Sequence, residues 1–540
     1  MLNLQIMPVI DFIQDHFSLG KIMVIPFQCA IDRNQCEQGL QLQFLRIRIV
    51  ILTLGILCPS IVCHSEEASA DKEELIRQSL NRAVRFFRTE VSTHGGYVHQ
   101  YSTDLRYREG EGAVGAETAW IEPPGTPFVG EAYLRAYQIC KEPTLLEAAK
   151  EVGNALVLGQ LDSGGWDNQI EFSAKKRSEI KYRIPFPEDG SGGGPVPTKR
   201  RNTTTLDDNK SQSACHFLMS LDEVLNFSDQ QIHHAAIYAL HSFLLAQYPN
   251  GAWPQRYDRE KDDTNRSKIY RASIPVDWPR EYPAKKYGDY YTLNDNSISD
   301  MILLMLDAWS IYEDEQYLNA AKRGGDFLVL SQLPDPQPGW AQQYDEKMHP
   351  AWARKFEPPA VTGGESQAVM KTLMVLYRRL AGHDSNADKY LQPVSRALPY
   401  YQNSLLPSGE LARFYELGTN QPLYMNRKYE LTYADDDLPT HYAFVVKSNL
   451  KKIQQEYDEL CKLDADQVWK APEISQPRRT SSLNKKVNEV AKRLDSRGAW
   501  VERGKLKYHE LNEDNQRIIR TTTFAQNIVL LASWLGGRSE

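Results

Sequence analysis

Apolar positions along this chain recur at helical spacing in consecutive pairs of segments, and polar turns containing glycine separate one pair from the next. Spacings of three and four residues between apolar side chains are typical of amphipathic helices that bury one face. They predict three helix pairs: 211–225 with 230–247, 297–312 with 315–332, and 366–380 with 389–401. Asn, Asp or Ser at the starts and Pro-Asn-Gly or Ser-Gly-Gly at the ends support these helix boundaries.

The helix pairs belong to an internal repeat. Gln160-x5-Trp166 returns as Gln247-x5-Trp253, an offset of 87 residues, and a third copy ends another 87 residues later at Trp340. A fixed period indicates a repeat architecture, and this period is long enough for two helices and a turn. We therefore predict an all-α fold, an α/α toroid of helical hairpins with short β-hairpin and loop excursions. The first helix of each pair is expected to line the central cavity.

The recurring Trp residues have two interpretations. For most copies we expect the indole to pack in the core beside its turn, as large aromatic side chains usually do. Trp253 is the expected exception, because Pro254 and Gln255 follow it at a place where a sugar ring could stack.

The first 70 residues differ from the repeat. Arg46 and Arg48 precede an apolar run at 49–62, and Ala68-Ser-Ala70 offers a small-residue cleavage site, the pattern of a secretory signal. The run of about 14 residues is short for a transmembrane helix. We predict that residues 1–70 are a signal region with an over-extended start, and that 71–540 form one exported domain, secreted or periplasmic. The alternative is a buried or membrane-anchoring N-terminal helix.

Charge and cysteine content narrow the class of protein further. The formal net charge of −7 argues against nucleic acid as a partner, although local arginine clusters still permit a polyanionic substrate. Of the seven cysteines, Cys140, Cys215 and Cys461 lie beyond the predicted signal region, so the mature chain has at most one disulfide. The sequence contains no CxxC pattern of the kind that binds zinc.

The strongest chemical signal is an acidic motif that follows the repeat. Thr205-Leu-Asp-Asp-Asn209 returns 87 residues later as Thr292-Leu-Asn-Asp-Asn296, each time directly before a predicted helix. In a toroid both motifs project from the same rim of the cavity. Carboxylate and amide oxygens gathered there are hard ligands suited to Ca²⁺. The alternative is that they only cap the two helices.

Arginines form a second polar group. Arg354 lies in a loop rich in Pro and Gly, and Arg413 and Arg427 lie on two short predicted strands joined by a turn at 418–420. Single surface arginines are usually solvated charges, so position alone leaves their roles open. The sequence shows no serine or cysteine nucleophile motif.

Together these motifs resemble the family 10 polysaccharide lyases, the α-toroidal pectate lyases, over roughly residues 75–540. Six motifs in the family's order make the resemblance specific. They are Gly164-Gly-Trp166, Thr204-Thr-Leu-Asp207, Gly251-Ala-Trp-Pro-Gln255, Thr292-Leu-Asn-Asp-Asn296, Pro350-Ala-Trp-Ala-Arg354 and Ala412-Arg-Phe-Tyr-Glu416. Two places depart from the family: TLDDNK stands where Thr-Ile-Asp-Asn-Gly-Ala is frequent, and Lys428 stands where Asp commonly follows the arginine.

The resemblance implies that the protein cleaves α-1,4-polygalacturonate (pectate) by Ca²⁺-assisted β-elimination. It implies that Arg427 is the catalytic base, that Asp207 and Asp295 are linked to Ca²⁺, and that Arg354 and Arg413 bind substrate carboxylates. Removing the C5 proton of a uronate builds negative charge on its carboxylate, which a cation and arginines stabilise. An arginine base predicts an alkaline optimum, because the guanidinium pKa is above ~12.

Two other functions stay open. An α/α-toroid glycoside hydrolase could use Asp207 and Asp295 as its two carboxylates. A non-catalytic relative could bind polyuronate without cutting it, and Lys428 and TLDDNK are the features that favour this reading. Under the leading hypothesis we expect polygalacturonate or a related acidic polysaccharide as partner, a monomer, no nucleic acid, and no stable membrane association after processing.

Overall fold

The computed structural model describes residues 60–184, 199–258, 268–464, 468, 477–509 and 517–538. The basic and apolar core of the predicted signal lies almost wholly in residues 1–59, outside the described residues. Helix α2 spans Ser60–Phe86, so the predicted boundary at residue 70 falls within a helix. The signal region and the domain boundary therefore stay predictions. Within the described part of the chain, no helix has the length and apolarity needed to cross a membrane.

Helices dominate the structure, and they follow one another in the pairs that the periodicity predicts. The predicted helix at 297–312 is α8 without a change of boundary, and the others agree within about two residues. The helices are α2 (Ser60–Phe86), α3 (Thr126–Cys140), α4 (Pro143–Gly159), α5 (Ala174–Arg177), α6 (Lys210–Val224), α7 (Gln230–Ala246), α8 (Ser297–Tyr312), α9 (Glu315–Leu330), α10 (Gly364–Leu380), α11 (Leu391–Asn403), α12 (Leu450–Leu460), α14 (Ser481–Arg493) and α15 (Thr521–Leu535).

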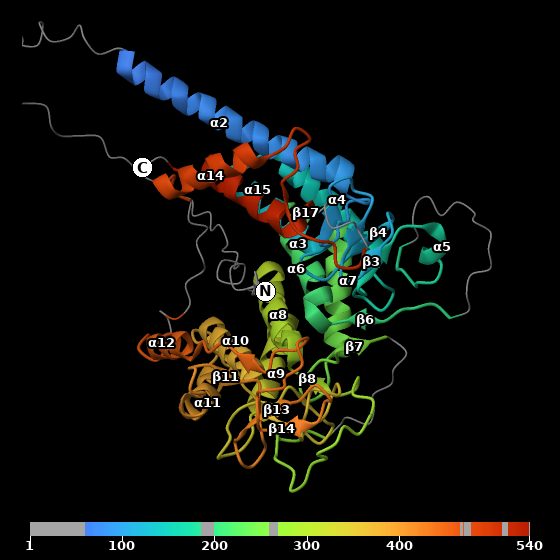
Figure 1. Ribbon diagram of the computed structural model, residues 1–540, viewed down its shortest axis with the longest axis vertical. Coiled ribbons are helices and arrows are strands. Elements are labelled where there is room, and N and C mark those ends of the chain that lie inside the picture. The colour runs from blue at the N-terminus through green and yellow to red at the C-terminus, as the bar shows by residue number, and fades with distance from the viewer. Residues whose placement is uncertain are drawn as a thin grey trace, which may run out of the picture.

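The pairs stack side by side into a curved array (Figure 1). The first helices contact one another in the order α15, α3, α6, α8 and α10, and α12 follows α10. Each first helix also contacts its own partner: α3 packs on α4, α6 on α7, α8 on α9, and α10 on α11. This is the predicted helix-rich α/α toroid architecture, although the array does not close into a barrel.

Short antiparallel strand pairs lie at one end of the inner helices. In three units, the strand that leads into the inner helix pairs with the strand that follows the Trp turn: β4 with β5, β6 with β7, and β8 with β9. In the next unit β10 pairs with β12, which follows a turn at 407–409 without a Trp. The strands are β1 (Gln100–Ser102), β2 (Arg108–Glu109), β3 (Ala113–Val114), β4 (Thr118–Trp120), β5 (Gln169–Glu171), β6 (Thr204–Thr205), β7 (Arg256–Tyr257), β8 (Tyr291–Thr292), β9 (Gln343–Tyr344), β10 (Val361–Thr362), β11 (Leu411–Ala412), β12 (Phe414–Tyr415), β13 (Pro422–Met425), β14 (Leu431–Thr432), β15 (Val445–Val446), β16 (Val501–Arg503) and β17 (Arg517–Arg520). These strands hold the start of every inner helix at a common rim.

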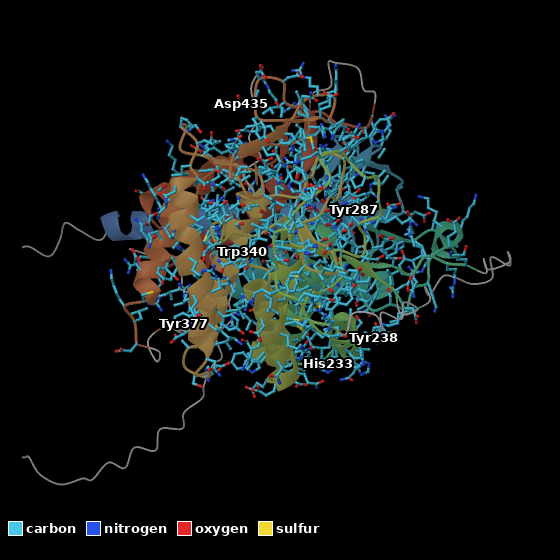
Figure 2. All side chains as sticks on the ribbon, turned by 90° about the horizontal axis from the view of Figure 1, so that it is seen from below. His233, Tyr238, Tyr287, Trp340, Tyr377 and Asp435 are labelled. Carbon is cyan, nitrogen blue, oxygen red and sulfur yellow. The ribbon has the colours of Figure 1, made fainter. Side chains whose placement is uncertain are left out.

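The repeated Trp residues are core residues in every copy, and this corrects the interpretation of Trp253 as a sugar platform. Trp253 is buried, and its indole N–H donates to the carbonyl of Phe243 at the end of the preceding helix. Trp340 makes the equivalent bond to Leu328 and lies in the middle of the molecule (Figure 2). Each turn thus folds its Trp back under the helix that it ends, where no sugar can reach the ring.

The repeated Gln has a structural role that the sequence did not reveal. The side-chain amide of Gln247 donates to the carbonyl of Gly251 within its own turn and to that of Ala320 in the outer helix of the next unit. Gly251 has φ 93°, and the carbonyl of Arg323 lies where its Cβ would be. The Gln-x5-Trp motif therefore closes a turn and ties one hairpin to the next.

Candidate active site

The two acidic motifs form matching turns at the rim, where β6 leads into α6 and β8 leads into α8. Asp208 and Asn209 have φ 52° and 55°, and Asp295 and Asn296 have φ 51° and 56°. Asp and Asn adopt this left-handed region more readily than most residues do. Neither helix has a side-chain cap hydrogen bond. The interpretation of these motifs as simple helix caps is therefore wrong, and their side chains are available for other contacts.

The turns bring the neighbouring carboxylates of Asp207 and Asp208 together with that of Asp295, which is far from them in the chain. One oxygen each from Asp207, Asp208 and Asp295 lies within 4.8 Å of the others. The Oδ1 atom of Asp207 is buried and has no hydrogen-bond partner among the described residues. Two half-buried anions and one exposed anion, with an unpaired oxygen among them, suit a bound cation, because like charges in contact otherwise repel.

The raised pKa values of two carboxylates in the cluster show the same repulsion. Loss of solvation, followed by repulsion from Asp208 and Asp207, raises the pKa of Asp295 to about 7. Burial and the neighbouring Asp208 likewise raise the pKa of Asp207. Oxygen ligands of this kind fit a hard divalent ion such as Ca²⁺.

Arg354 and Arg413 border the same cluster. Arg354, in the loop between β9 and β10, pairs through its guanidinium with the buried carboxylate of Glu357. Arg413, between β11 and β12, lies 3.2 Å from Glu365 through Nη1. The hydrogen bond with Glu357 raises the pKa of Arg354. Burial opposes the charged form of Arg413, but Glu365 and Tyr442 outweigh it and raise its pKa. Both side chains therefore carry permanent positive charge beside Asp295.

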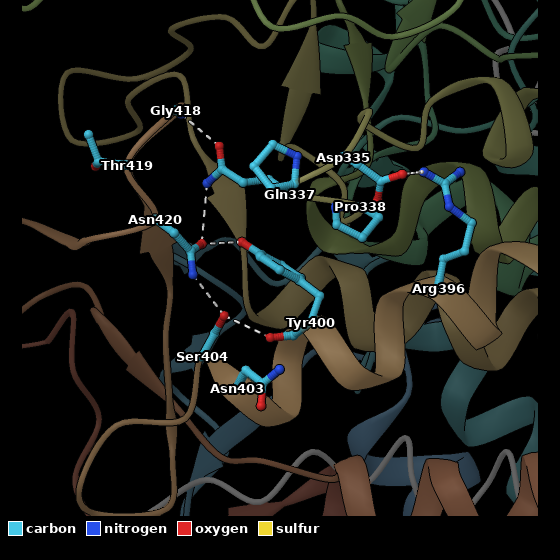
Figure 3. A pocket seen from close by; sticks show the side chains of 11 residues that line it. Asp335, Gln337, Pro338, Arg396, Tyr400, Asn403, Ser404, Gly418, Thr419 and Asn420 are labelled. Atoms are coloured by element: carbon cyan, nitrogen blue, oxygen red, sulfur yellow. Dashed lines mark hydrogen bonds and ion pairs between the residues drawn. The ribbon is translucent and has the colours of Figure 1, made fainter.

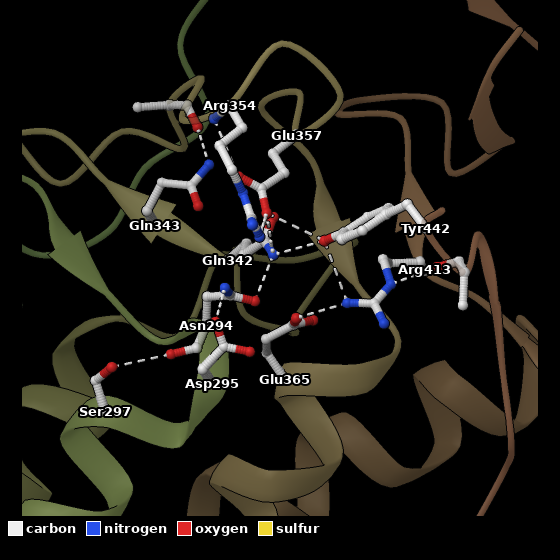
Figure 4. A network of polar contacts seen from close by, with 12 residues as sticks. Asn294, Asp295, Ser297, Gln342, Gln343, Arg354, Glu357, Glu365, Arg413 and Tyr442 are labelled. Atoms are coloured by element: carbon white, nitrogen blue, oxygen red, sulfur yellow. Dashed lines mark hydrogen bonds and ion pairs between the residues drawn. The ribbon is translucent and has the colours of Figure 1, made fainter. Parts of the chain in front are cut away.

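Tyr442 connects the two arginines, and sequence reasoning missed it (Figure 4). Its hydroxyl accepts from Arg413 Nη1 at 3.3 Å and donates to Glu357 Oε1 at 3.2 Å. Its ring lies under both guanidinium groups, 4.6 Å from that of Arg413 and 5.8 Å from that of Arg354. Tyr442 stands in a loop without motif or repeat, so no local signal could have identified it.

Gln342 was also missed, although the repeat contained a signal for it. It stands two residues after Trp340, as Gln255 stands two residues after Trp253. Its amide donates to Asn294 Oδ1 at 2.6 Å and to the Tyr442 hydroxyl at 3.0 Å. The residue two places after the Trp therefore supports the acidic turn of the same repeat unit.

Arg427 lies at the edge of this group. The predicted hairpin exists: β12 pairs with β13, and Arg427 follows β13 on an exposed turn. Its side chain is 68% exposed, and its Nε lies 3.3 Å from Asp437. The nearby ring of Tyr429 lies 6.1 Å from that of Phe356, in the loop that carries Arg354. The structure thus brings Asp207, Asp295, Arg354 and Arg413 together, and leaves Arg427 on a neighbouring hairpin.

A second charged group lies further along the inner helices. His216 on α6 is 2.7 Å from Glu131 on α3 through Nδ1, and 3.7 Å from Asp307 on α8 through Nε2. Arg379 on α10 is 3.4 Å from the same Asp307. Burial opposes charging, but Glu131 and Asp307 outweigh it and raise the pKa of His216 to about 9. This chain of ion pairs links four consecutive inner helices away from the rim.

A cavity of about 480 Å³ lies outside the cluster, between α11, the segment at 335–338 and the turn at 418–420 (Figure 3). Its polar groups pair with one another: Asn420 Nδ2 donates to Ser404 Oγ at 2.9 Å, and Arg396 lies 3.2 Å from Asp335. None of the predicted site residues lines it. The carboxylate and arginine cluster at the rim is therefore the candidate active site.

Comparison with known proteins gives a family. A family model described as pectic acid lyase matches residues 160–441, which include every predicted site residue. This chain belongs to the pectic acid lyase family. Family membership supports polysaccharide lyase activity. No curated protein matches the chain.

Solved structures that resemble this pectic acid lyase family member are distant. A family 10 polysaccharide lyase from Cellvibrio cellulosa is 17% identical, with a TM-score of 0.40, covering 58% of this chain and 92% of that one. A variant of that lyase in complex with trigalacturonic acid is 16% identical, with a TM-score of 0.39, and the match covers 62% of this chain and 98% of that one. Cellobiose 2-epimerase from Bacillus thermoamylovorans is 13% identical, with a TM-score of 0.41, and the match covers 86% of this chain and 99% of that one.

Proposed function

We propose that this protein is a secreted pectate lyase, a monomer that cleaves α-1,4-polygalacturonate by Ca²⁺-assisted β-elimination. The observation that carries the proposal is the meeting of an acidic cluster with two fixed arginines at one rim. Asp207, Asp208 and Asp295 would hold the ion, and Arg354 and Arg413 flank it. A polyuronate supplies each of these guanidinium groups with a carboxylate in addition to Glu357 and Glu365, whereas a neutral substrate supplies none.

The chain's own residues account for the main demands of the reaction. Arg354 and Arg413 bind uronate carboxylates and keep negative charge beside C5 stabilised as its proton leaves. Glu357, Glu365 and Tyr442 hold those guanidinium groups in place. Ca²⁺ held by Asp207, Asp208 and Asp295 would supply further stabilisation of this negative charge. Because the arginines are oriented before substrate arrives, little reorganisation is needed during the reaction.

We assign the proton transfer to Arg427. Arg354 lies closer to the acidic cluster, but its pairing with Glu357 raises its pKa and suits a permanent cation. Arg427 is exposed on the adjoining hairpin, where a bound polymer would approach it. Arg427→Ala should lower turnover by about 10²–10⁴-fold, the usual contribution of a positioned base. Substrate binding should barely change, because the loss falls on the transition state.

One experiment tests the reaction class. The enzyme is incubated with polygalacturonate, with added Ca²⁺ or with chelator, and ultraviolet absorbance is followed. Elimination produces an unsaturated uronate that absorbs, and it should require Ca²⁺. Chain cleavage without new absorbance would support the glycoside hydrolase with Asp207 and Asp295 as its carboxylates. Binding of polygalacturonate without turnover, across pH and Ca²⁺ concentration, would instead support a non-catalytic relative.

A second experiment tests the base. Arg427→Ala and Arg354→Ala are compared with Arg503→Ala, which removes an exposed arginine on β16. Turnover and polygalacturonate binding are measured for each. Normal turnover in Arg427→Ala, together with lost turnover but intact binding in Arg354→Ala, would move the base to Arg354. The Arg503 variant should behave as the unmodified enzyme.

A further inference from the structure

Glu122 and Asp208 form a second acidic notch at the rim, and the side chain of Lys210 fills it. Lys210, the first residue of α6, is 3% exposed. Its Nζ lies 2.8 Å from Asp208 Oδ2 and 3.1 Å from Glu122 Oε2. An ammonium group removed from water at this depth requires carboxylates around it, and Glu122 and Asp208 provide them.

Glu122 belongs to the same series of rim positions as the acidic turns. The residue before it, Ile121, donates its N–H to the carbonyl of Asn168 at 2.9 Å, and Leu206 before Asp207 makes the corresponding bond to Gln255 at 2.8 Å. Glu122 therefore occupies, in the α3 unit, the place that Asp207 occupies in the α6 unit. Acidic side chains stand at this rim in three successive units.

Asp208 is shared between two notches. Towards α8 it faces Asp207 and Asp295, with oxygens within 4.8 Å of one another. Towards α3 it faces Glu122 across the Lys210 ammonium. At the position 87 residues later, equivalent to Lys210, α8 begins with Ser297, which carries no charge. The two notches thus lie at successive places along the rim and differ in the presence of a tethered cation.

We propose that Lys210 is a positioning residue that acts as a tethered cation: it fills the Glu122–Asp208 notch and confines the rim to a single divalent ion between Asp207, Asp208 and Asp295. The inference rests on the proposed Ca²⁺ site and concerns how many ions the rim accepts. With Lys210 in place, its ammonium compensates the charge of Asp208 on the side of α3. On the side of α8, Asp208 stays oriented towards Asp207 and Asp295. Without it, Glu122 and Asp208 form an acidic pair of the kind that hard cations bind.

The test is Ca²⁺ binding to the full chain, measured by calorimetry and by native mass spectrometry, which counts the ions. Lys210→Ser introduces the residue that begins α8. The unmodified protein should bind one Ca²⁺, Lys210→Ser should bind two, and Lys210→Ser combined with Glu122→Gln should return to one. Lys210→Arg, which keeps the charge, should bind one. A single ion with unchanged affinity in Lys210→Ser overturns the inference.

Glu122→Gln alone keeps the inference testable if Lys210→Ser does not fold. With Glu122 neutralised, Lys210 has Asp208 as its remaining carboxylate and draws it away from the ion, so Ca²⁺ affinity should fall several-fold with one ion bound. Unchanged affinity in Glu122→Gln contradicts the inference. An unmodified protein that cleaves polygalacturonate but binds no Ca²⁺ overturns the metal part of the proposed function, and the inference with it. One ion in every variant overturns the inference alone.

Discussion

The turn at Thr205–Asn209 and the turn at Thr292–Asn296 share a backbone, with the same two consecutive left-handed residues, yet they have different neighbours. In the first, Asp208 contacts the ammonium of Lys210. In the second, Asp295 faces Arg354 and Arg413, which are held by Glu357 and Glu365. A repeat therefore preserves the position at which side chains emerge, while the loops inserted between repeats decide which charges meet them.

The largest expected effect comes from removing a carboxylate from either turn. Asp295→Ala and Asp207→Ala should each lower turnover by at least ~10²-fold, because each removes a preorganised electrostatic element. Added Ca²⁺ should restore little activity, whereas Ca²⁺ should fully restore the chelated unmodified enzyme. Asp277→Ala, which removes an exposed carboxylate, serves as control and should keep normal rates. Full activity of the enzyme in chelator would show that the two turns do not act through a metal.

A smaller effect separates the second turn from the first through its arginines. Arg354→Lys and Arg413→Lys keep the charge but lose the planar fork that binds carboxylates, so each should lower kcat/KM on polygalacturonate by about tenfold. Methyl-esterified pectin should be a poorer substrate than the free acid for the unmodified enzyme. Initial rates on both substrates measure the difference. Equal rates on the two would remove these arginines from substrate binding.

Tyr442 provides a finer test of the same side of the rim. Tyr442→Phe keeps the ring under both guanidinium groups but removes the hydroxyl that joins Arg413 to Glu357. The loss of a hydrogen bond to charged groups costs about 1.5–3 kcal/mol at most, and several-fold loss of kcat/KM is expected because the ring remains. Steady-state kinetics measures it, with Tyr377→Phe on α10 as control. A rate like that of the unmodified enzyme would mean that the ring alone positions the arginines.

The smallest effect concerns the inner helices away from the rim. The pKa of His216 is about 9 in the folded chain, above its ordinary value of about 6.5. The charged His216 therefore stabilises the folded state fully below about pH 6.5, and this contribution is lost as pH rises through about 9. His216→Ala should lower the free energy of unfolding by about 1–2 kcal/mol at pH 6 and by less at pH 10. Denaturant unfolding at both values measures this, with the exposed His234→Ala as control. A loss independent of pH would mean that His216 contributes packing alone.

Much of the fold could be predicted because its signals are local. Apolar spacing and turn chemistry located α6 to α11 within about two residues, and the hairpin turn at Gly418 and Asn420 appeared where Gly and Asn predicted it. The interpretation of Trp253 failed for the opposite reason. Whether an indole faces solvent depends on the helix that covers it, and here the ring packs back under α7.

The candidate site was predictable in part. The 87-residue offset placed the two acidic motifs, which contain Asp207 and Asp295, at a common rim, since equivalent segments of a repeat emerge at equivalent places. Tyr442 and Glu122 gave no such signal: they come from loops of different length, and their contacts span 85 and 88 residues of chain. The role of Arg427 stays a prediction, because its exposed side chain pairs with Asp437 and has no contact with the cluster in the described part of the chain.

The sequence by itself determined the repeat, the helical hairpins and the acidic rim, because helix periodicity, glycine turns and equivalent repeat positions depend on residues close together in the chain. The tertiary structure alone decided which charges meet at that rim. Asp208 lies beside Lys210 and Glu122, while Asp295 lies beside two arginines. These partners are brought together by stacking successive hairpins, and the electrostatic interactions that set the chemistry act over a few ångströms of space, whatever the separation along the chain.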